Sequence, residues 1–215
     1  MFKIKKLMAS VLVASFAITA LAPATAGAAF VESKGQIKSN KDVVTRIVNY
    51  SQNNRNRLDT LIAAVTCEQF DGAIVKTLQE APKVTVFAPT NYAFAKLGRQ
   101  LDKALGLGLG PDGITKDNVC AVDSLLGEGT LATILTYHVT TPKIWYGQAL
   151  RARGAELTML SGEKALVSGA GKRVKIDGEF VRVKNIRSGN GITHVISGVM
   201  VPPSIEKAIE DALAA

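Results

Sequence analysis

The stretch from Val84 to Leu97, VTVFAPTNYAFAKL, constrains the fold most, because it joins a strand to a helix within fourteen residues. Its first residues are mostly β-branched or aromatic, which favours an extended strand. Pro89 lacks an amide donor and holds the preceding residue extended, so the strand has to end there. Thr90 or Asn91 can then cap a helix whose apolar residues recur with helical spacing. The structural residues of this motif are Thr85, Phe87, Pro89, Thr90, Asn91 and Phe94.

Two later stretches complete an ordered pattern. Residues 134–139 read ILTYHV, and residues 190–203 read NGITHVISGVMVPP. Together with VTVFAPTNYAFAKL, these blocks resemble the fasciclin (FAS1) domain, and three ordered motifs are more specific than any one of them. The resemblance implies a mixed α/β (α+β) fold, a compact β-wedge of short strands with helices packed beside it. It also implies an exported, non-enzymatic adhesion or binding module that contacts a cell surface, a matrix or a polysaccharide.

The chain divides into four expected segments. Residues 1–28 carry a basic start, an apolar run and small-residue cleavage sites, which together predict a signal peptide. We expect a flexible lead-in over residues 29–41, the fasciclin-like domain over residues 42–203 and a C-terminal helix over residues 204–215. No second membrane-spanning candidate follows the signal segment. The expected location is therefore secreted or periplasmic, with the cell surface as one place of association, and we expect no transmembrane anchor.

The charge of the chain favours an anionic partner. The whole sequence has a formal net charge of +8, and three positive charges lie in the signal segment, which leaves +5 for the mature chain. A moderately basic protein suits association with anionic surfaces or polymers. The charges are too few and too scattered to predict nucleic-acid binding. We expect a cell-surface or matrix component as the partner, with an anionic polysaccharide as the specific candidate.

Residues that could carry catalysis are few. The chain has two histidines, His138 and His194, and neither has cysteines at zinc-ligand spacing or a G-x-S-x-G serine in the sequence. We therefore expect no catalytic residue, no metal site and no cofactor. The resemblance implies that His138 is buried and hydrogen-bonded, and we expect the same of His194. Tyr137 is either a core residue or, as the resemblance to adhesive relatives implies, a contact residue.

Residues 173–184 predict a β-hairpin around a type I′ turn at Asp177–Gly178. Continued pairing would set Arg173 opposite Arg182. The buried face would then hold Val174, Ile176, Val181 and Val183. The outer face would hold the candidate binding residues Arg173, Lys175, Phe180, Arg182 and Lys184. An anionic partner would relieve the repulsion between the opposed arginines, and the alternative is a solvated face that discourages edge pairing.

A second basic and aromatic stretch precedes the hairpin, and two polar positions depart from the family pattern. The stretch contains Lys143, Trp145, Tyr146, Arg151 and Arg153, which we expect to lie half in the core and half on the surface. Asn185 stands where the family often has Asp, and Ser197 stands where it commonly has an acid. Both changes remove a negative charge, which argues against an acid-dependent contact like that of some relatives.

Cys67 and Cys120 are the only cysteines, and an export signal would send both to an oxidising compartment. We favour a disulfide between them over two buried free thiols. Gly98 to Val119 is longer than the family's usual connection and includes the glycine-rich run GLGLGPDG, which predicts a loop. The bridge would tether this insertion to the helices. In an alternative function, an extracytoplasmic small-ligand binder or enzyme accessory protein, the loop would cover a deep apolar pocket.

Overall fold

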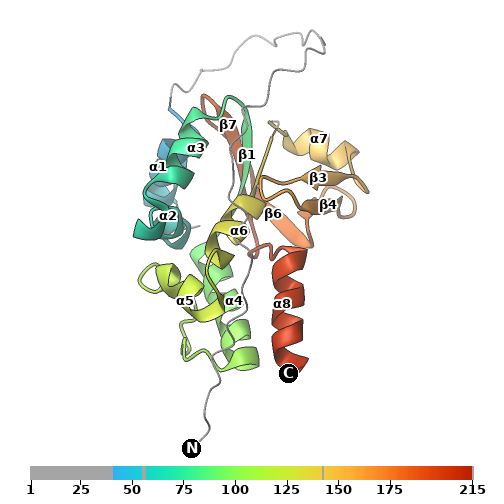
Figure 1. The fold of residues 1–215 in the computed structure, drawn as a ribbon. Helices are drawn as coiled ribbons and strands as arrows, with labels where there is room; N and C mark the ends of the chain where they lie inside the picture. Colours follow the sequence, from blue (N-terminus) through green and yellow to red (C-terminus); the bar gives the residue numbers. More distant parts are fainter. Residues whose placement is uncertain (1–40, 55–56, 142, 215) are drawn as a thin grey trace, which may run out of the picture. The chain divides into compact units, whose positions relative to one another are not determined.

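Seven strands form one mixed sheet in the computed structural model, which describes residues 41–54, 57–141 and 143–214 (Figure 1). The strand order is β2-β1-β7-β6-β5-β4-β3. β1 and β7 run parallel, whereas the other neighbouring pairs are antiparallel. The strands are β1 (Val84–Pro89), β2 (Val139–Thr140), β3 (Glu156–Thr158), β4 (Lys164–Ser168), β5 (Lys175–Ile176), β6 (Glu179–Arg187) and β7 (Gly191–Ile196). The expected signal peptide and nearly all of the lead-in lie outside the described residues.

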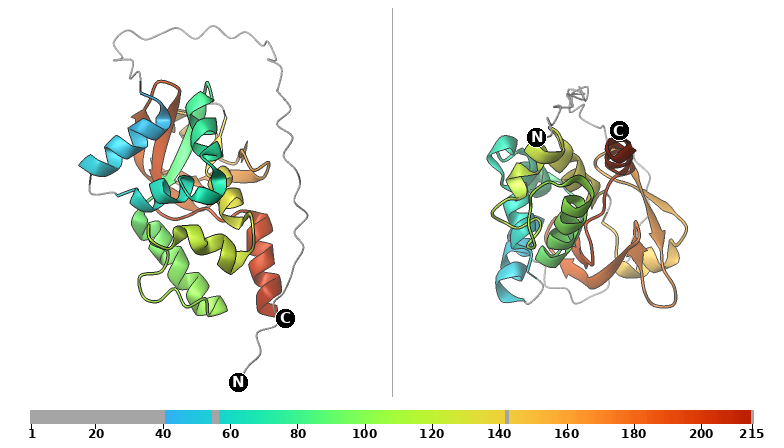
Figure 2. Two further views of the ribbon diagram at one scale, coloured as in Figure 1. Left: turned by 60° about the vertical axis from the view of Figure 1, so that its left-hand side comes forward. Right: turned by 90° about the horizontal axis from the view of Figure 1, so that it is seen from below.

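Helices cover the sheet from several directions. The helices are α1 (Val43–Asn53), α2 (Asp59–Val65), α3 (Ala73–Glu80), α4 (Asn91–Leu105), α5 (Val122–Leu126), α6 (Thr130–Tyr137), α7 (Tyr146–Arg151) and α8 (Pro203–Ala214). Short 3₁₀ turns, η1 (Glu68–Phe70) and η2 (Val119–Ala121), complete the set. α1, α2 and α3 lie on one side of the central strands, and α7 with β3 and β4 lies on the other (Figures 1 and 2). This mixed sheet with flanking helices confirms the predicted fold class.

Two hydrophobic clusters divide the core. The first joins residues of α1 to α6 with one side of β1 and β7, and Val86 and Phe94 belong to it. The second joins α7 with β3 to β6 and the other side of the central strands, and it contains Phe87, Tyr137 and Ile176. Successive residues of a strand point to opposite faces of a sheet, so Val86 and Phe87 enter different clusters. β1 is therefore buried on both faces.

The junction between β1 and α4 forms as predicted. β1 ends at Pro89, and the Thr90 hydroxyl caps α4 by accepting the amide hydrogen of Ala93 over 3.3 Å. Asn91 ties the junction to α2, because its side-chain oxygen accepts the Thr60 amide hydrogen over 3.1 Å. Its side-chain nitrogen donates to the Asp59 carboxylate, also over 3.1 Å. One Thr-Asn pair thus fixes both the start of α4 and the position of α2.

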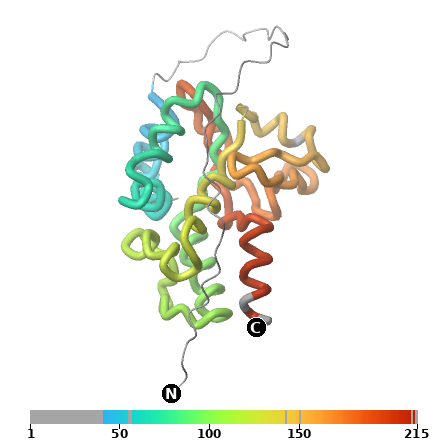
Figure 3. The backbone as a smooth tube through the Cα atoms, viewed as in Figure 1, coloured from blue at the N-terminus to red at the C-terminus, as the bar shows by residue number. Residues whose placement is uncertain are grey.

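The insertion after α4 is shorter than predicted and is docked onto the helix. α4 continues through Gly98 to Leu105, and the chain then returns to η2 (Figure 3). A Cβ on Gly98 would lie 2.1 Å from the amide nitrogen of Ile114, and one on Gly113 would lie 2.2 Å from the Ala95 carbonyl oxygen. The glycines thus permit direct backbone contact between the helix and the loop. The glycine-rich run of residues 106–113 is a loop as predicted, whereas residues 98–105 of the expected insertion belong to α4.

The predicted disulfide is present. Cys67 lies two residues after the end of α2, Cys120 lies in η2, and their Cα atoms are 5.6 Å apart. The bridge therefore ties the end of the insertion to the helical layer. No described helix is by itself long and apolar enough to cross a membrane; one pair bent by 120°, residues 119–126 with 130–137, meets the length and composition requirement together.

The hairpin has the predicted turn and inner pairs but not the predicted outermost pair. Lys175 pairs with Phe180 and Ile176 with Glu179. Beyond Val181, whose amide hydrogen bonds to the Val174 carbonyl oxygen, the pairing changes because β6 bulges against β7. The predicted opposition of Arg173 and Arg182 is wrong. Arg173 instead closes a turn by donating its amide hydrogen to the Ala170 carbonyl oxygen. Arg182 lies in the first bulge of β6, between Val181 and Val183.

The bulges also divide the predicted faces. Val181 packs in the second hydrophobic cluster with Val174 and Ile176, whereas Val183 packs against the first. The prediction that Val183 shares their face is therefore wrong, because an extra residue shifts the side-chain alternation of a strand. A second bulge follows at Asn185, which has a positive φ of 59°.

The final helix also begins differently from expectation. It starts at Pro203, a favourable first helical residue because its missing amide hydrogen has no helical partner there. Ser204 is the second residue of the helix. Its hydroxyl donates to the Glu163 carboxylate over 2.8 Å and so ties the helix to the turn after β3. α8 then runs away from the sheet (Figures 1 and 2).

Candidate functional site

Cations stack on aromatic rings at two places along β6, where a single basic face was predicted. At the hairpin end, the Phe180 ring lies 4.5 Å from the Lys175 ammonium nitrogen and 5.5 Å from the Arg182 guanidinium carbon. These three residues, here called the hairpin site, share the face expected for them. Such distances are typical of cation–π contacts. Arg173 lies in the exposed turn before β5 and takes no part in these contacts.

Lys184 belongs to a second and larger group, because the bulge moves it away from Phe180. Its ammonium nitrogen lies 5.0 Å from the centre of the Tyr146 ring. Next to it, the Trp145 ring has the Arg187 guanidinium at 4.8 Å and the Lys143 ammonium at 5.9 Å. We call Lys143, Trp145, Tyr146, Lys184 and Arg187 the tryptophan site. It joins the second basic stretch of the sequence to the far half of β6.

Hydrogen bonds from two strands and from α7 hold the backbone of residues 144–146 in place. The Ile144 amide hydrogen bonds to the Thr85 hydroxyl of β1 over 2.8 Å. The Tyr146 amide hydrogen bonds to the Asn185 side-chain oxygen of β6 over 3.0 Å. In addition, the Gln148 side-chain oxygen accepts the Trp145 amide hydrogen over 2.7 Å at the start of α7. The two rings are therefore presented by a fixed segment.

His194 connects the two parts of the tryptophan site. The Asn185 amide hydrogen points at His194 Nδ1 over 3.2 Å, so Nδ1 must be an acceptor. The other nitrogen, Nε2, then carries the hydrogen and donates to the Ile144 carbonyl oxygen over 2.9 Å. Burial lowers the pKa of His194, although its bond to Ile144 acts in the opposite direction. The imidazole is therefore neutral near pH 7 and joins β7 to both Asn185 and Ile144.

The cations of the tryptophan site have no acidic partner in the described part of the chain. The four ion pairs found there join Arg57 with Asp59, Lys116 with Asp117, Lys164 with Glu156 and Lys207 with Asp211. Burial, and secondarily the positive charge of Arg187, lower the pKa of Lys143. Lys143 and Arg187 thus repel each other beside the Trp145 ring. An anion placed between them would reverse that repulsion.

Tyr137 and His138 lie in the interior. Tyr137 is completely buried, and its hydroxyl lies 2.9 Å from the Lys164 carbonyl oxygen and 3.0 Å from the Asp177 carboxylate. Burial, and next the charge of Asp177, raise the pKa of Tyr137. This placement removes Tyr137 from the surface that a partner can touch, so the proposed contact role does not fit the geometry.

His138 has both ring nitrogens engaged. Nε2 accepts the Met200 amide hydrogen over 3.0 Å, so Nδ1 carries the hydrogen and donates to the Ile134 carbonyl oxygen over 2.7 Å. Burial lowers the pKa of His138 to about 4. The residue thus links α6 to the chain after β7.

The two departures from the family pattern have local structural partners. Asn185 takes the left-handed conformation that asparagine tolerates well, and its side chain supports Tyr146. Ser197 accepts the Phe180 amide hydrogen over 2.9 Å and donates to the Glu179 carboxylate over 2.6 Å. An acid therefore lies beside this position, but it comes from the hairpin. Sequence reasoning treated Asn185 only as a departure from the family pattern and missed Arg187 and Glu179. The placement of Arg187 depends on bulges that arise from the pairing of β6 with β7.

The hollow beside the insertion differs from the deep apolar pocket expected under it. Residues of the insertion line a wide, partly polar hollow beside Asn91 and Tyr92. The apolar cavity of the domain lies elsewhere, between α1, α2 and α3, and no residue of the insertion lines it. A deep apolar pocket lined by residues 98–119 would have supported a lid role for them, and neither the hollow nor the cavity provides it. Within the described chain, no cluster of three or more His, Cys, Asp or Glu residues could hold a metal ion.

The fold and its surface define a class of protein, a mixed-sheet domain that presents cations and aromatic rings on a fixed backbone. Comparisons with known proteins give the family. The family model of the fasciclin domain matches residues 56–202, so the chain belongs to the fasciclin-domain family. A FAS1 domain pair from the insect cell adhesion molecule Fasciclin I shares the fold, with a TM-score of 0.53, 15% identity and coverage of 80% of this chain and 53% of that chain.

Curated relatives come from bacteria and animals. Protein sll1483 of Synechocystis sp. is 33% identical over 147 residues, which are 67% of this chain and 67% of that protein. Transforming growth factor-beta-induced protein ig-h3 of Oryctolagus cuniculus is 30% identical over 155 residues, and the chain covers 18% of its length. Immunogenic protein MPB70 of Mycobacterium bovis is 28% identical over 156 residues, with 66% of that protein covered. The chain thus matches a small part of the animal protein and about two thirds of the bacterial ones.

Proposed function

We propose that this protein is an exported, non-enzymatic adhesion module whose tryptophan site contacts an anionic polysaccharide of a cell surface or matrix. Membership of the fasciclin family supports the general class, and the fold is shared with a protein described as a cell adhesion molecule. The predicted signal peptide supports export.

The observation that carries the proposal is the placement of Lys143 and Arg187 on the Trp145 ring without an acidic side chain between them. Like charges without an acidic partner repel each other, and a carboxylate or sulfate group would bind them favourably. The half-buried rings supply apolar surface beside the charges, as amphipathic aromatic side chains do at interfaces. A sugar polymer with acidic groups offers both kinds of contact. Trp145 and Tyr146 would touch the sugar rings, and Lys143, Lys184 and Arg187 would bind the acidic groups.

The hairpin site is the other candidate for the same function. It has two cations and one ring, and both cations already lie against Phe180. Its residues stay in the proposal as a weaker contact region. The tryptophan site is preferred because it has more cations, more aromatic surface and a backbone fixed by β1, β6 and β7.

Three double variants test the site, and each removes two positive charges. Lys184→Gln with Arg187→Gln changes the tryptophan site, and Lys175→Gln with Arg182→Gln changes the hairpin site. Lys96→Gln with Lys103→Gln, on exposed positions of α4, is the control. On an immobilised heparin column, the first variant should elute at clearly lower salt than the other two. Equal elution of all three would contradict the proposal, because only the net charge would then matter.

The single tryptophan gives a second, site-specific measurement. Trp145 is the only tryptophan in the chain, so its fluorescence reports on this site alone. Heparin should change the emission of the wild-type protein and of the α4 control. Added salt should reverse the change, because exposed charges are screened over about 10 Å at 0.1 M ionic strength. An unchanged emission during binding would place the contact elsewhere.

A further inference from the structure

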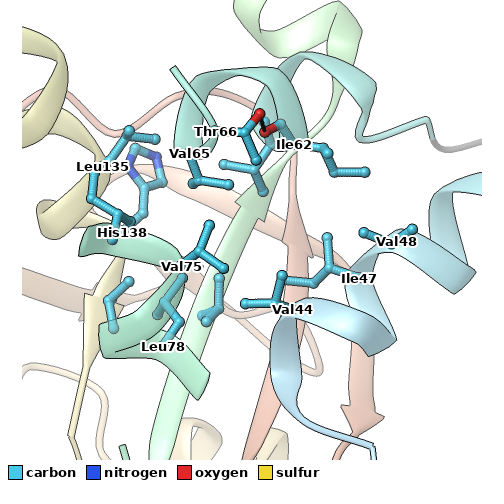
Figure 4. A pocket seen from close by; sticks show the side chains of 14 residues that line it. Val44, Ile47, Val48, Ile62, Val65, Thr66, Val75, Leu78, Leu135 and His138 are labelled. Carbon is cyan, nitrogen blue, oxygen red and sulfur yellow. Dashed lines mark hydrogen bonds between the residues drawn. The ribbon is translucent and has the colours of Figure 1, made fainter. Parts of the chain in front are cut away.

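An apolar cavity lies between α1, α2, α3 and the central strand β1, on the side of the sheet opposite α7 (Figure 4). Its volume is about 100 Å³, and fourteen side chains line it. Twelve of these side chains are aliphatic, among them Val44 and Ile47 of α1, Val65 of α2 and Val75 of α3. Protein interiors are normally packed with few voids larger than a water molecule, so a cavity of this size needs an explanation.

The two polar residues of the lining leave the interior apolar. His138 has both ring nitrogens bonded to backbone groups, Ile134 and Met200. The Thr66 hydroxyl donates to the Ile62 carbonyl oxygen over 2.9 Å, within its own helical turn. No charged residue lines the cavity. Nothing inside can satisfy a polar ligand group, whereas apolar cavities of comparable size bind small apolar molecules.

The surroundings of the opening favour a narrow ligand over a protein partner. The rim is formed by half-buried aliphatic residues, including Val48, Ile62 and Val75. Exposed residues of α1 and α3, such as Arg46 and Lys76, are charged. A docking protein would need a continuous apolar surface around the opening. The end of an aliphatic ligand chain can enter through the opening without such a surface.

We propose that this cavity binds the end of an unbranched aliphatic chain, such as the tail of a fatty acid or of a lipid. The terminal carbons would lie among Val44, Ile47, Val65 and Val75, and the polar head would stay outside, next to the polar residues of α1 and α3. Apart from the His138 imidazole, the lining consists of aliphatic side chains and one threonine, which suits a saturated chain better than a flat ring. This site lies on the opposite side of the sheet from the tryptophan site and does not depend on the proposed adhesive function.

Methyl NMR of the intact mature protein tests the site with 1-decanol as the probe. Decanol should move the methyl signals of Val44, Ile47 and Val75 and leave those of Leu166 and Val174 in place. Leu166 is exposed on β4, so its signal reports non-specific binding to the surface. Val174 is buried in the second cluster, so its signal reports a general loosening of the fold. Across 1-hexanol, 1-octanol and 1-decanol, affinity should rise about fourfold for each methylene group that enters the cavity. Cavity signals that do not move, or that move together with Leu166 and Val174, would overturn the proposal.

A filling variant and a matched control localise the effect. Val75→Phe places a ring at the cavity and should weaken decanol binding at least about tenfold. Thr77→Phe adds the same ring on the exposed side of the same helix and should bind as the wild type does. If Val75→Phe does not fold, Val48→Phe fills the cavity from α1. Equal decanol binding by wild type and a folded filling variant would refute the site.

Two further probes identify the source of the chain. Sodium decanoate, below its micelle concentration, supplies a free fatty acid, and phosphatidylglycerol vesicles supply a chain within a bilayer. Movement of the cavity methyl signals by decanoate supports a free chain, and binding to vesicles that Val75→Phe abolishes supports a membrane lipid. Failure of decanol, decanoate and vesicles alike would remove the proposal, whatever the heparin experiments show.

Discussion

At the scale of single residues, the two histidines act as neutral hydrogen-bonding groups inside the fold. Each accepts a backbone amide hydrogen at one nitrogen and donates to a carbonyl oxygen at the other. A second proton would turn each acceptor into a donor that faces another donor. Protonation of either ring therefore competes with the folded structure, which gives the fold a defined dependence on pH.

His138 should make the free energy of unfolding rise as the pH increases from about 4 to 6.5. Burial lowers its folded pKa to about 4 from an ordinary value of 6.5. Between those values the unfolded chain binds the proton and the folded chain does not, so stability is full above pH 6.5 and falls as the pH drops. The shift corresponds to about 3 kcal/mol. Urea unfolding at a series of pH values measures the effect.

The control for this prediction is His138→Ala. It should cost about 1–3 kcal/mol near pH 7, because it leaves the Met200 amide and the Ile134 carbonyl without a partner. Its pH profile should be flatter than that of the wild type between pH 4 and 6.5. Asp177, whose pKa is raised chiefly by burial, contributes in the opposite direction and is present in both proteins. Identical profiles would show that His138 does not titrate as inferred. A variant that keeps its stability but loses heparin binding would show that the residue is part of the binding site.

His194 should couple pH to the tryptophan site. Its folded pKa is lowered by burial, so the ring gains a proton only below pH 6.5. The proton on Nδ1 would then face the Asn185 amide hydrogen and weaken the support of residues 144–146. Trp145 emission should shift to longer wavelength with a midpoint below pH 6.5 while the far-UV circular dichroism stays constant. His194→Gln should lack this transition, and persistence of the transition in that variant would assign it to another group.

At the scale of elements, the sequence predicts those strands, turns and helix starts that depend only on neighbouring residues. The β1 to α4 junction follows from Pro89 and Thr90 alone, and the hairpin turn follows from Asp177–Gly178. The bulges of β6 depend on its pairing with β7, so nothing in residues 179–187 alone places them. This is why Lys184 was assigned to the face of Phe180 and Arg187 was overlooked. The tryptophan site combines β6 with residues 143–146, about forty positions away, and that contact follows from tertiary packing.

The contact between α4 and the insertion can be tested at Gly98. Replacing a helical glycine by alanine ordinarily stabilises a helix by about 1 kcal/mol. Here the new methyl group would meet the Ile114 backbone, so Gly98→Ala should instead destabilise by about 1–3 kcal/mol. Gly147→Ala, in α7 with open space around it, is the control and should be neutral or stabilising. Urea midpoints measure both, and stabilisation by Gly98→Ala would show that the loop is not docked on α4.

At the scale of the whole molecule, the sheet separates two surfaces of different chemistry. The tryptophan site lies on the side of the second hydrophobic cluster, against which Tyr146 packs. The apolar cavity lies within the first cluster, among α1, α2 and α3. A polysaccharide and an aliphatic chain would therefore reach the domain from opposite sides. A module that holds a lipid tail on one side and a sugar polymer on the other would be well suited to an envelope surface.

Export and the disulfide together give a prediction for the whole chain. The bridge between Cys67 and Cys120 closes a separation of 53 residues, for which loop entropy gives about 4 kcal/mol as an upper bound. Thiols stay reduced in most cytoplasmic compartments, so the bridge should form only if residues 1–28 direct the chain out of the cytoplasm. We therefore expect bacterial expression of the full chain to give an exported protein whose intact mass begins after Ala26 or Ala28. Labelling of that protein, denatured but unreduced, should modify neither cysteine.

The control is a variant that begins at Ala29, lacks the predicted signal peptide and therefore stays in the cytoplasm. When purified with its thiols protected, it should label at both Cys67 and Cys120 and unfold at a lower urea concentration than the exported protein. Oxidation in vitro should restore the urea midpoint of the exported protein. The fold places the two Cα atoms 5.6 Å apart, a distance that suits a disulfide. Retention of the full-length mass in the membrane would contradict the signal peptide. Free thiols in the exported protein would contradict the bridge, and equal urea midpoints would show that the bridge contributes little to stability.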